Sequence, residues 1–232
     1  MRFKAFCVEN NGYHEKIELS WSYCVAAGYT GRNQKNVLAH VEELKKIGVP
    51  APYAVPAMYW FDPERVTTSD ILSVVGEKTS GEIEFFLASD DYGDLYVTVA
   101  SDHTDRQLET VSVSKAKQAC SKIIAPAFWR FSEIRSHWDK ILLKAEISKD
   151  GKHFFTYQEG FLGQMLQPEY LLELARRDSP VSDASISLFS GTLPVQGEGI
   201  VYGCAYKLCI QDPVLNRSIM KDYIVRVLPD RN

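Results

Sequence analysis

Three acidic residues in two short motifs are the side chains most able to support chemistry. Glu82 and Glu84 lie within residues 81–87, and Asp102 lies within residues 101–106. Because successive side chains of a strand point to opposite faces, the two glutamates would share one face while the apolar residues beside them face a core. Neighbouring carboxylates repel each other, and a divalent cation is the simplest group that would offset this repulsion.

A hairpin would bring the third acid to the other two. Residues 95–99 have the aromatic and β-branched composition of a second strand, and residues 91–94 favour a turn before it. Antiparallel pairing would place Asp102 near Glu82. Two glutamates and an aspartate offer only oxygen ligands, which suits Mg²⁺, Mn²⁺ or Ca²⁺ as the cofactor and disfavours zinc or copper. The alternative interpretation is an exposed strand face with solvated acids.

Composition and charge narrow the range of partners. The chain has 232 residues, of which 45% are hydrophobic and 24% charged, as in an ordinary globular protein. A net charge of -4 and scattered basic residues argue against a nucleic-acid partner. No segment approaches the ~20 apolar residues of a membrane span, and no apolar signal segment follows residues 1–4. We therefore expect neither a nucleic-acid nor a membrane partner, and a cytoplasmic location.

The five cysteines are expected to be free thiols, because none forms a Cys-x-x-Cys pair. Cys120 lies near Lys115, Lys117 and Lys122, which would lower the pKa of its thiol and make it a candidate nucleophile. A structural role for this cysteine is the interpretation that we favour.

The pattern of elements predicts a mostly β protein. Asn33 would cap a helix running to about residue 47, a proline-rich extended segment covers residues 49–61, and a second helix covers residues 165–177. Strands are expected at residues 1–8, 17–22, 141–147, 154–158, 186–189, 199–210 and 223–228. The fold class is therefore α+β, mostly β, with mixed sheets and few helices. We expect an N-terminal β/helix segment at 1–60 that packs on a core at 61–232.

The order of the motifs resembles that of a known superfamily. The Glu-x-Glu strand, the motif from Asp102 to Arg106 and the late segment 190–192 resemble the fumarylacetoacetate hydrolase superfamily. Residues 101–106, 137–139, 157–160 and 190–194 are more closely similar to a branch catalogued only as a domain of unknown function. The resemblance runs from about Tyr23 to the C-terminus, and implies sheets of the fumarylacetoacetate hydrolase-like type.

The resemblance also implies roles for individual residues. It assigns Glu82, Glu84 and Asp102 to the metal ion. Substrate binding is assigned to Arg106, Glu109, Gly191 and Thr192. Glu109 stands where the superfamily often has a glutamine, which would alter substrate recognition. The superfamily's downstream lysine is matched by Lys117, with Lys115 as the alternative.

A base that activates water is implied on the helix after Asn33. His40 and Glu43 lie three residues apart there, although their spacing differs from that of the superfamily motif. His103 is a second candidate for the base.

The implied function is that of a divalent-metal-dependent enzyme acting on a 2-oxo acid or β-dicarbonyl compound through a metal-stabilised enolate. Hydrolysis of a C–C bond is the leading expectation, and decarboxylation or isomerisation would share the enolate. The alternative to an enzyme is a metal-free binding protein with the same fold. The expected partners are a small-molecule carboxylate and, because superfamily members are commonly dimers, a second copy of the chain.

Overall fold

The computed structural model describes residues 1–9, 12, 14–46, 51–197 and 199–231. Inside the first helix, the side chains of four residues lie outside the described part, namely His40, Glu43, Leu44 and Lys46. Across the described ranges, no helix has the length and apolar character needed to cross a bilayer.

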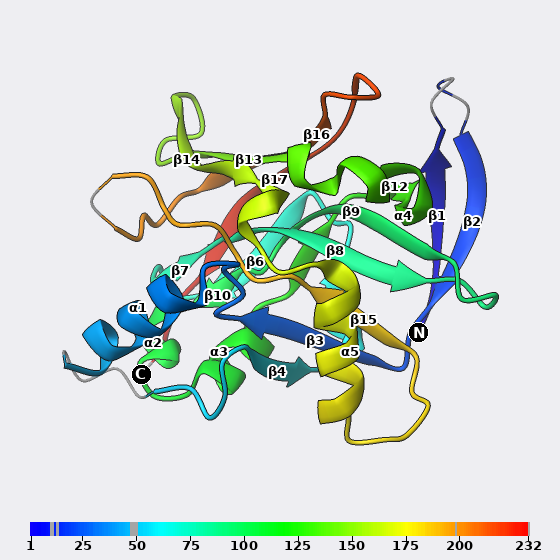
Figure 1. Cartoon of the computed structure of the whole chain (residues 1–232). Helices are drawn as coiled ribbons and strands as arrows, with labels where there is room; N and C mark the ends of the chain where they lie inside the picture. The colour runs from blue at the N-terminus through cyan, green and yellow to red at the C-terminus, as the bar shows by residue number, and fades with distance from the viewer. Residues whose placement is uncertain (10–11, 13, 47–50, 198, 232) are drawn as a thin grey trace.

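Within the described residues, ten strands form the larger sheet, in the order β4-β3-β15-β8-β2-β1-β12-β9-β11-β5. Figure 1 shows two of them, β8 and β9, side by side. They are β1 (Arg2–Val8), β2 (His14–Ser20), β3 (Tyr23–Gly28), β4 (Ala57–Phe61), β5 (Val66–Thr67), β8 (Ile83–Ser89), β9 (Leu95–Ser101), β11 (Lys122–Ile124), β12 (Ala127–Arg130) and β15 (Ile186–Phe189). The pairs β1–β2, β2–β8, β8–β9, β9–β12 and β12–β1 close a ring of five strands within it.

Five strands form the second sheet, in the order β14-β13-β16-β17-β6. They are β6 (Ile71–Val75), β13 (Leu142–Ser148), β14 (Phe154–Phe161), β16 (Ala205–Asp212) and β17 (Arg217–Leu228), and a short pair is formed by β7 (Thr79–Ser80) and β10 (Thr104–Asp105). Parallel pairs such as β6–β17 and β3–β15 occur beside antiparallel ones, so both sheets are mixed, as predicted.

Helices are few and mostly short. They are α1 (Gln34–Lys46), α2 (Arg106–Glu109), α3 (Val113–Ala119), α4 (Phe131–Ile134) and α5 (Pro168–Asp178), with 3-10 turns η1 (Pro63–Arg65), η2 (Arg135–Lys140) and η3 (Leu162–Gln164). Strands hold 45% of the residues and helices 21%, which confirms the predicted mostly β class.

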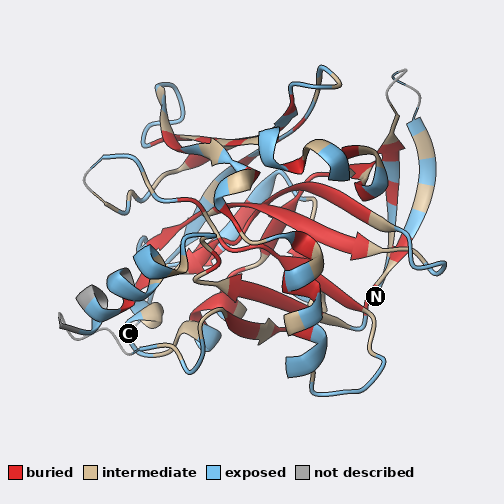
Figure 2. Ribbon diagram, in the orientation of Figure 1, coloured by how far each residue is buried: buried red, intermediate tan, exposed pale blue. Residues whose placement is uncertain are grey.

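Strand β8 is buried on both faces, which explains its apolar composition. Ile83, Phe85 and Leu87 belong to the main core, as the alternation predicted. Phe86 and Ala88 point the other way into a second apolar cluster. Figure 2 shows the strands at the centre of the molecule as buried, the described part of α1 as largely exposed, and α5 as buried on one face and exposed on the other. Glu84, which lies in this strand, is therefore buried as well.

Several element boundaries differ from the sequence prediction. Helix α1 starts as expected, because Asn33 Oδ1 accepts a hydrogen bond from the backbone of Asn36 at 3.3 Å; the glycine and proline expected to end it lie outside the described residues. Helix α5 begins at Pro168 rather than Met165, since proline suits the first helical position and η3 occupies the preceding segment. The expected strand 199–210 starts only at Ala205.

Strands from both sides of residue 60 share the larger sheet. Strand β3 pairs with β15 in parallel over four residue pairs, and with β4 in antiparallel orientation. The division of the chain at residue 60 stays a prediction.

Candidate metal centre

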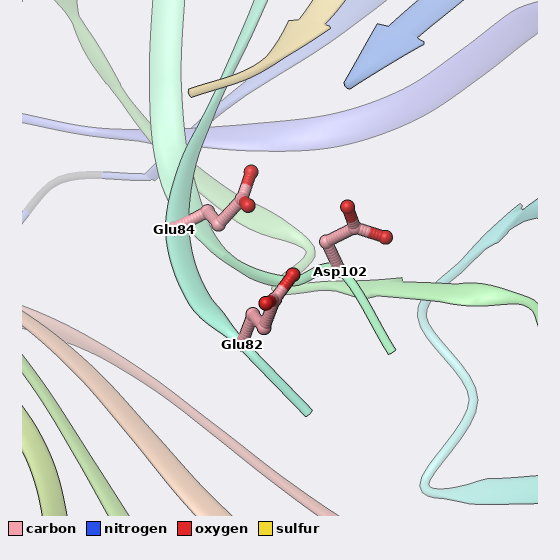
Figure 3. Close-up of side chains that lie close together, drawn as sticks. All are labelled: Glu82, Glu84 and Asp102. Carbon is pink, nitrogen blue, oxygen red and sulfur yellow. The ribbon is translucent and has the colours of Figure 1, made fainter. Parts of the chain in front are cut away.

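The β8–β9 hairpin brings the three predicted acids together. Glu84 is paired with Ala100, and the backbone N–H of Asp102 donates to the carbonyl of Glu82 at 3.0 Å. One carboxylate oxygen from each of Glu82, Glu84 and Asp102 lies within 4.8 Å of the other two. Figure 3 shows the two glutamates on the same strand side, with Asp102 opposite them. The short hairpin therefore suffices to cluster the acids.

The acids are not solvated. Glu84 and Asp102 are each 1% exposed, and the side chain of Glu82 is 17% exposed. The alternative of an exposed strand face is therefore wrong. Burying three carboxylates side by side is costly unless cations compensate their charge.

Two lysines and an arginine supply positive charge. Lys117 Nζ lies 2.7 Å from Glu82 Oε2 and 2.7 Å from Asp102 Oδ2. Lys122 Nζ lies 2.6 Å from Asp102 Oδ1 and donates to the carbonyl of His103 at 2.5 Å. Arg106 contacts Glu82 at 3.0 Å. Lys122 is 0% exposed and was not predicted as a site residue. The sequence signal that could have identified it is its position at the start of an apolar run.

The neighbouring charges shift the pKa values of the three acids in different directions. Burial and the nearby Asp102 raise the pKa of Glu84 well above its ordinary value. Burial also raises the pKa of Asp102, but Lys117 and Lys122 outweigh it and lower that pKa to about 2. For Glu82, Arg106 and Lys117 likewise outweigh burial, so its pKa is lowered. Lys117 also acts on Glu84, but it does not outweigh burial and the neighbouring acids, so Glu84 is the least compensated of the three.

The donor set fits a hard divalent ion. Three carboxylates offer oxygen ligands of the kind that Mg²⁺ and Mn²⁺ prefer. Each Asp102 oxygen contacts one lysine ammonium, and a carboxylate oxygen has a second lone pair for another partner. These oxygens retain coordinating capacity, and an ion beside Glu84 would favour its charged form against the burial and the repulsion by Asp102 that raise its pKa.

Gly191 and Thr192 lie next to the acids. The backbone N–H of Gly191 donates to Glu84 Oε2 at 3.0 Å, and the Thr192 hydroxyl donates to the carbonyl of Ile83 at 2.8 Å. Gly191 has φ +80°, and a Cβ there would lie 2.4 Å from Thr30 Oγ1 and 2.8 Å from the carbonyl of Ala27. Only glycine fits this position.

Arg106 and Glu109 are joined to each other. Arg106 Nη1 contacts Glu109 Oε2 at 2.8 Å, and Arg106 Nε donates to Ser80 Oγ at 2.7 Å. With its third contact, to Glu82, each of the three guanidinium nitrogens has a partner. The role of these two residues in substrate binding stays a prediction.

The remaining candidates are placed differently. Lys115 is exposed on α3, whereas Lys117 of the same helix points into the site. His103 is buried between Tyr223 and Thr79, and burial lowers its pKa well below the ordinary value. His40 and Glu43, the pair expected to activate water, fall on α1, but both side chains lie outside the described residues, so their role stays a prediction.

Cys120 does not have an activated thiol. It is 4% exposed, and burial raises the pKa of the thiol to about 11 although Lys122 opposes this. The expectation that nearby lysines lower its pKa is wrong, because desolvation of a thiolate outweighs the opposing effects of Lys122 and Arg106.

Comparison with known proteins supports the fold. Residues 27–223 match the model of a family described as "Protein of unknown function (DUF2848)". A solved structure of 2-keto-3-deoxy-D-arabinonate dehydratase complexed with magnesium and 2,5-dioxopentanoate is similar with a TM-score of 0.64 and 17% identity, over 90% of this chain and 74% of that chain. Cg1458 with inhibitor is similar with a TM-score of 0.61 and 18% identity, over 93% and 81%. No curated protein matched the chain.

At these identities the likeness concerns the fold alone. It confirms the predicted fold class, mixed sheets of the fumarylacetoacetate hydrolase-like type with few helices.

Proposed function

The chain belongs to the DUF2848 family, and for this member we propose a divalent-metal-dependent enzyme that acts on a 2-oxo acid or β-dicarbonyl compound. One observation carries the proposal: the oxygens of Glu82, Glu84 and Asp102 converge within 4.8 Å. Clustered, buried carboxylates cost stability, and such a cost is typical of sites kept for binding or catalysis.

Glu82, Glu84 and Asp102 would hold the ion, and Mg²⁺ is its proposed identity. The dehydratase of similar fold was crystallised with magnesium, and the donor set here suits that ion. When bound, the ion would act as a Lewis acid on the oxygens of a 2-oxo acid and favour the enolate. Gly191 supports this arrangement, because its N–H holds the carboxylate of Glu84 in place.

Lys117 is the proposed catalytic group nearest to the reacting atoms. Burial lowers its pKa, but Asp102, Glu82 and Glu109 outweigh this and raise it, so the ammonium stays charged. It would donate hydrogen bonds to the substrate oxygen on which negative charge develops. His40 and Glu43 are proposed to activate water from α1.

Hydrolysis of a C–C bond remains the leading proposal for the reaction. Water would add to the distal carbonyl of a β-dicarbonyl acid, the C–C bond would break, and its electron pair would form the enolate that is then protonated. Decarboxylation and isomerisation would use the same enolate.

Dehydration is a second candidate, which the similarity in fold to 2-keto-3-deoxy-D-arabinonate dehydratase favours. Loss of the C3 proton from a 4-hydroxy-2-oxo acid would give the enolate, and the C4 hydroxyl would then leave as water. This route needs a proton donor at the leaving oxygen and no activated water.

A metal titration tests the site. The chelator-treated protein is titrated calorimetrically with Mg²⁺ and Mn²⁺, beside Glu84→Gln, Asp102→Asn and the control Glu64→Gln, which changes an exposed glutamate in η1. Binding in wild type and the control, but not in the two site variants, is expected. Absence of binding in wild type, with and without a 2-oxo acid, would favour the metal-free binding protein instead.

A product analysis then separates the reactions. Acylpyruvates and 4-hydroxy-2-oxo acids are incubated with the metal-loaded protein and the products are identified by mass spectrometry. Hydrolysis splits the carbon chain with gain of water, whereas dehydration keeps the chain and loses water. Turnover of neither class would contradict the proposed activity.

The expected homodimer also stays a proposal. Light scattering coupled to size-exclusion chromatography at several concentrations would test it. A mass of 26.3 kDa at all concentrations would contradict it.

A further inference from the structure

The hydroxyl of Tyr223 contacts both side chains that flank Asp102 in the sequence. It lies 2.9 Å from Ser101 Oγ and 3.0 Å from His103 Nδ1, so it is hydrogen-bonded to both. Tyr223 belongs to β17 of the second sheet, whereas Ser101 ends β9 of the larger sheet. One residue of the second sheet thus holds the chain on both sides of a candidate metal ligand.

These contacts determine the direction of the Asp102 side chain. Because successive side chains of an extended chain point to opposite sides, anchoring Ser101 and His103 on one side directs Asp102 to the other. There its carboxylate lies with those of Glu82 and Glu84, one oxygen of each within 4.8 Å of the others. The hydrogen bonds behind Asp102 and the cluster of acids in front of it are therefore parts of one arrangement.

The same hydroxyl lies close to the chain that leads into the two glutamates. A Cβ at Gly81 would lie 2.4 Å from the Tyr223 hydroxyl oxygen and 2.7 Å from Ser101 Oγ. A larger residue at this position would therefore disrupt the hydrogen bond between Tyr223 and Ser101. Since Gly81 directly precedes Glu82, Tyr223 lies beside both arms of the hairpin that brings the acids together.

The position of this hydroxyl is itself fixed by packing. The ring of Tyr223 is stacked on that of Tyr206, the residue paired with it on β16, with centroids 4.8 Å apart and planes 4° apart. On the other side of the imidazole, His103 Nε2 lies 2.9 Å from Thr79 Oγ1. Ser101, His103, Thr79 and Tyr223 are each at most 3% exposed. A buried network with these partners holds one geometry.

We propose that Tyr223 is a positioning residue for the metal centre: its hydroxyl holds the chain on both sides of Asp102 and so fixes that carboxylate in the orientation that binds a divalent ion. The inference rests on the proposed function, because it assumes an ion bound at the three acids. Groups that orient metal ligands from behind commonly contribute about 10–100-fold to metal affinity.

Ion selectivity distinguishes this role from a general contribution to stability. Mg²⁺ requires near-ideal octahedral geometry, whereas Ca²⁺ accepts irregular geometry and longer ligand distances. A less firmly held Asp102 should therefore weaken Mg²⁺ binding more than Ca²⁺ binding. A variant that is only less stable would lose affinity for both ions by the same factor, because the unfolded fraction binds neither.

The dissociation constants of Mg²⁺ and Ca²⁺ are measured calorimetrically on chelator-treated wild type, Tyr223→Phe, Ser101→Ala and Tyr96→Phe. Tyr223→Phe keeps the stacked ring and removes only the hydroxyl. Ser101→Ala removes one partner of that hydroxyl and carries the test if Tyr223→Phe does not fold. Tyr96→Phe is the matched control, because Tyr96 is 1% exposed and its hydroxyl accepts a hydrogen bond from Arg130 Nη1 at 2.8 Å, near the opposite end of β9 from Asp102.

Tyr223→Phe should weaken Mg²⁺ binding by about tenfold or more and Ca²⁺ binding by less than about threefold. Ser101→Ala should change the ratio of the two dissociation constants in the same direction, and Tyr96→Phe should leave both constants within about twofold of wild type. An unchanged ratio in the folded site variants, whether both affinities fall or neither does, overturns the positioning role and leaves the proposed metal centre intact. Failure of wild type to bind either ion, with and without a 2-oxo acid, overturns the proposed function and this inference with it.

Discussion

The ammonium nitrogen of Lys117 lies 2.7 Å from Oδ2 of Asp102. The same nitrogen lies 2.7 Å from Oε2 of Glu82, so the chain supplies its own cation between two of the three acids. A divalent ion at these acids would compete with this ammonium for the same oxygens.

Replacing Lys117 should therefore raise the affinity for Mg²⁺ and lower turnover. In Lys117→Met the competing charge is gone, and Mg²⁺ should bind about tenfold more tightly, as repulsion between cations a few ångströms apart is removed. Turnover should fall by about 100-fold if the ammonium stabilises charge in the transition state. Calorimetry and steady-state kinetics measure the two effects.

Lys115→Met is the matched control, because Lys115 is exposed on the same helix, α3. It should change neither quantity appreciably. Weaker Mg²⁺ binding in Lys117→Met would show that Lys117 supports the metal site rather than competing with the ion.

Lys122 should be essential for stability. Its ammonium is 0% exposed and pairs with buried Asp102, and loss of one partner of a buried pair costs about 3–5 kcal/mol. Lys122→Met should lose free energy of unfolding of this order in urea titrations. In Lys122→Met with Asp102→Asn the loss should be smaller than the sum of the single losses by about 1 kcal/mol or more.

The control for this cycle is the half-exposed pair Lys144–Glu146, 3.1 Å apart on β13. Lys144→Met should cost less than about 1 kcal/mol. Additive losses in the Lys122–Asp102 cycle would show that the two side chains are not energetically coupled.

Local sequence signals predicted the parts of the site that depend on neighbours in the chain. Alternation along residues 82–87 and a turn before residue 95 were enough to place Glu82 and Glu84 beside Asp102. The cap at Asn33 was visible for the same reason.

Long-range contacts were not predictable from such signals. Lys122 reaches Asp102 only because β11 pairs with both β9 and β5, and its burial depends on this tertiary context. Likewise Gly191 fits the site because its missing Cβ makes room for Thr30; the two residues follow the strands β15 and β3, which are distant in sequence. The alternation of apolar residues and the strand propensities of single residues do not predict such long-range pairings.

Cys120 should be unreactive in the native protein. With its pKa raised to about 11 by burial, the thiolate fraction at pH 7.5 is small, and iodoacetamide should label it about 100-fold or more slowly than a free thiol. Partly exposed Cys204 should react first. Peptide mapping by mass spectrometry measures both rates, with urea-unfolded protein as the reference in which the rates converge. Rapid labelling of Cys120 in the native protein, together with loss of activity, would support the alternative in which Cys120 is a catalytic nucleophile.

Asp212 should make stability depend on pH at the hairpin between β16 and β17. Its buried carboxylate accepts the backbone N–H groups of Val214 and Leu215 at 3.0 and 3.1 Å and lies 3.0 Å from His137 Nε2. Burial raises the pKa of Asp212, but these hydrogen bonds together outweigh it and lower the pKa. The charged form is therefore the one that the fold stabilises.

The sign of the effect follows from this lowered pKa. Below the pKa of an unfolded aspartate, ~3.9, the unfolded chain binds a proton that the folded chain does not, so this stabilisation is full above about pH 5 and is lost as the pH falls through the folded value. Asp212→Asn should cost about 1–3 kcal/mol at pH 7, and its free energy of unfolding should approach that of wild type as the pH is lowered towards 2. Urea unfolding from pH 7 to pH 2 measures both curves, with Asp222→Asn, at an exposed position of β17, as the control. A gap between wild type and Asp212→Asn that stays constant over this range would show that the carboxylate's charge contributes nothing to the hairpin.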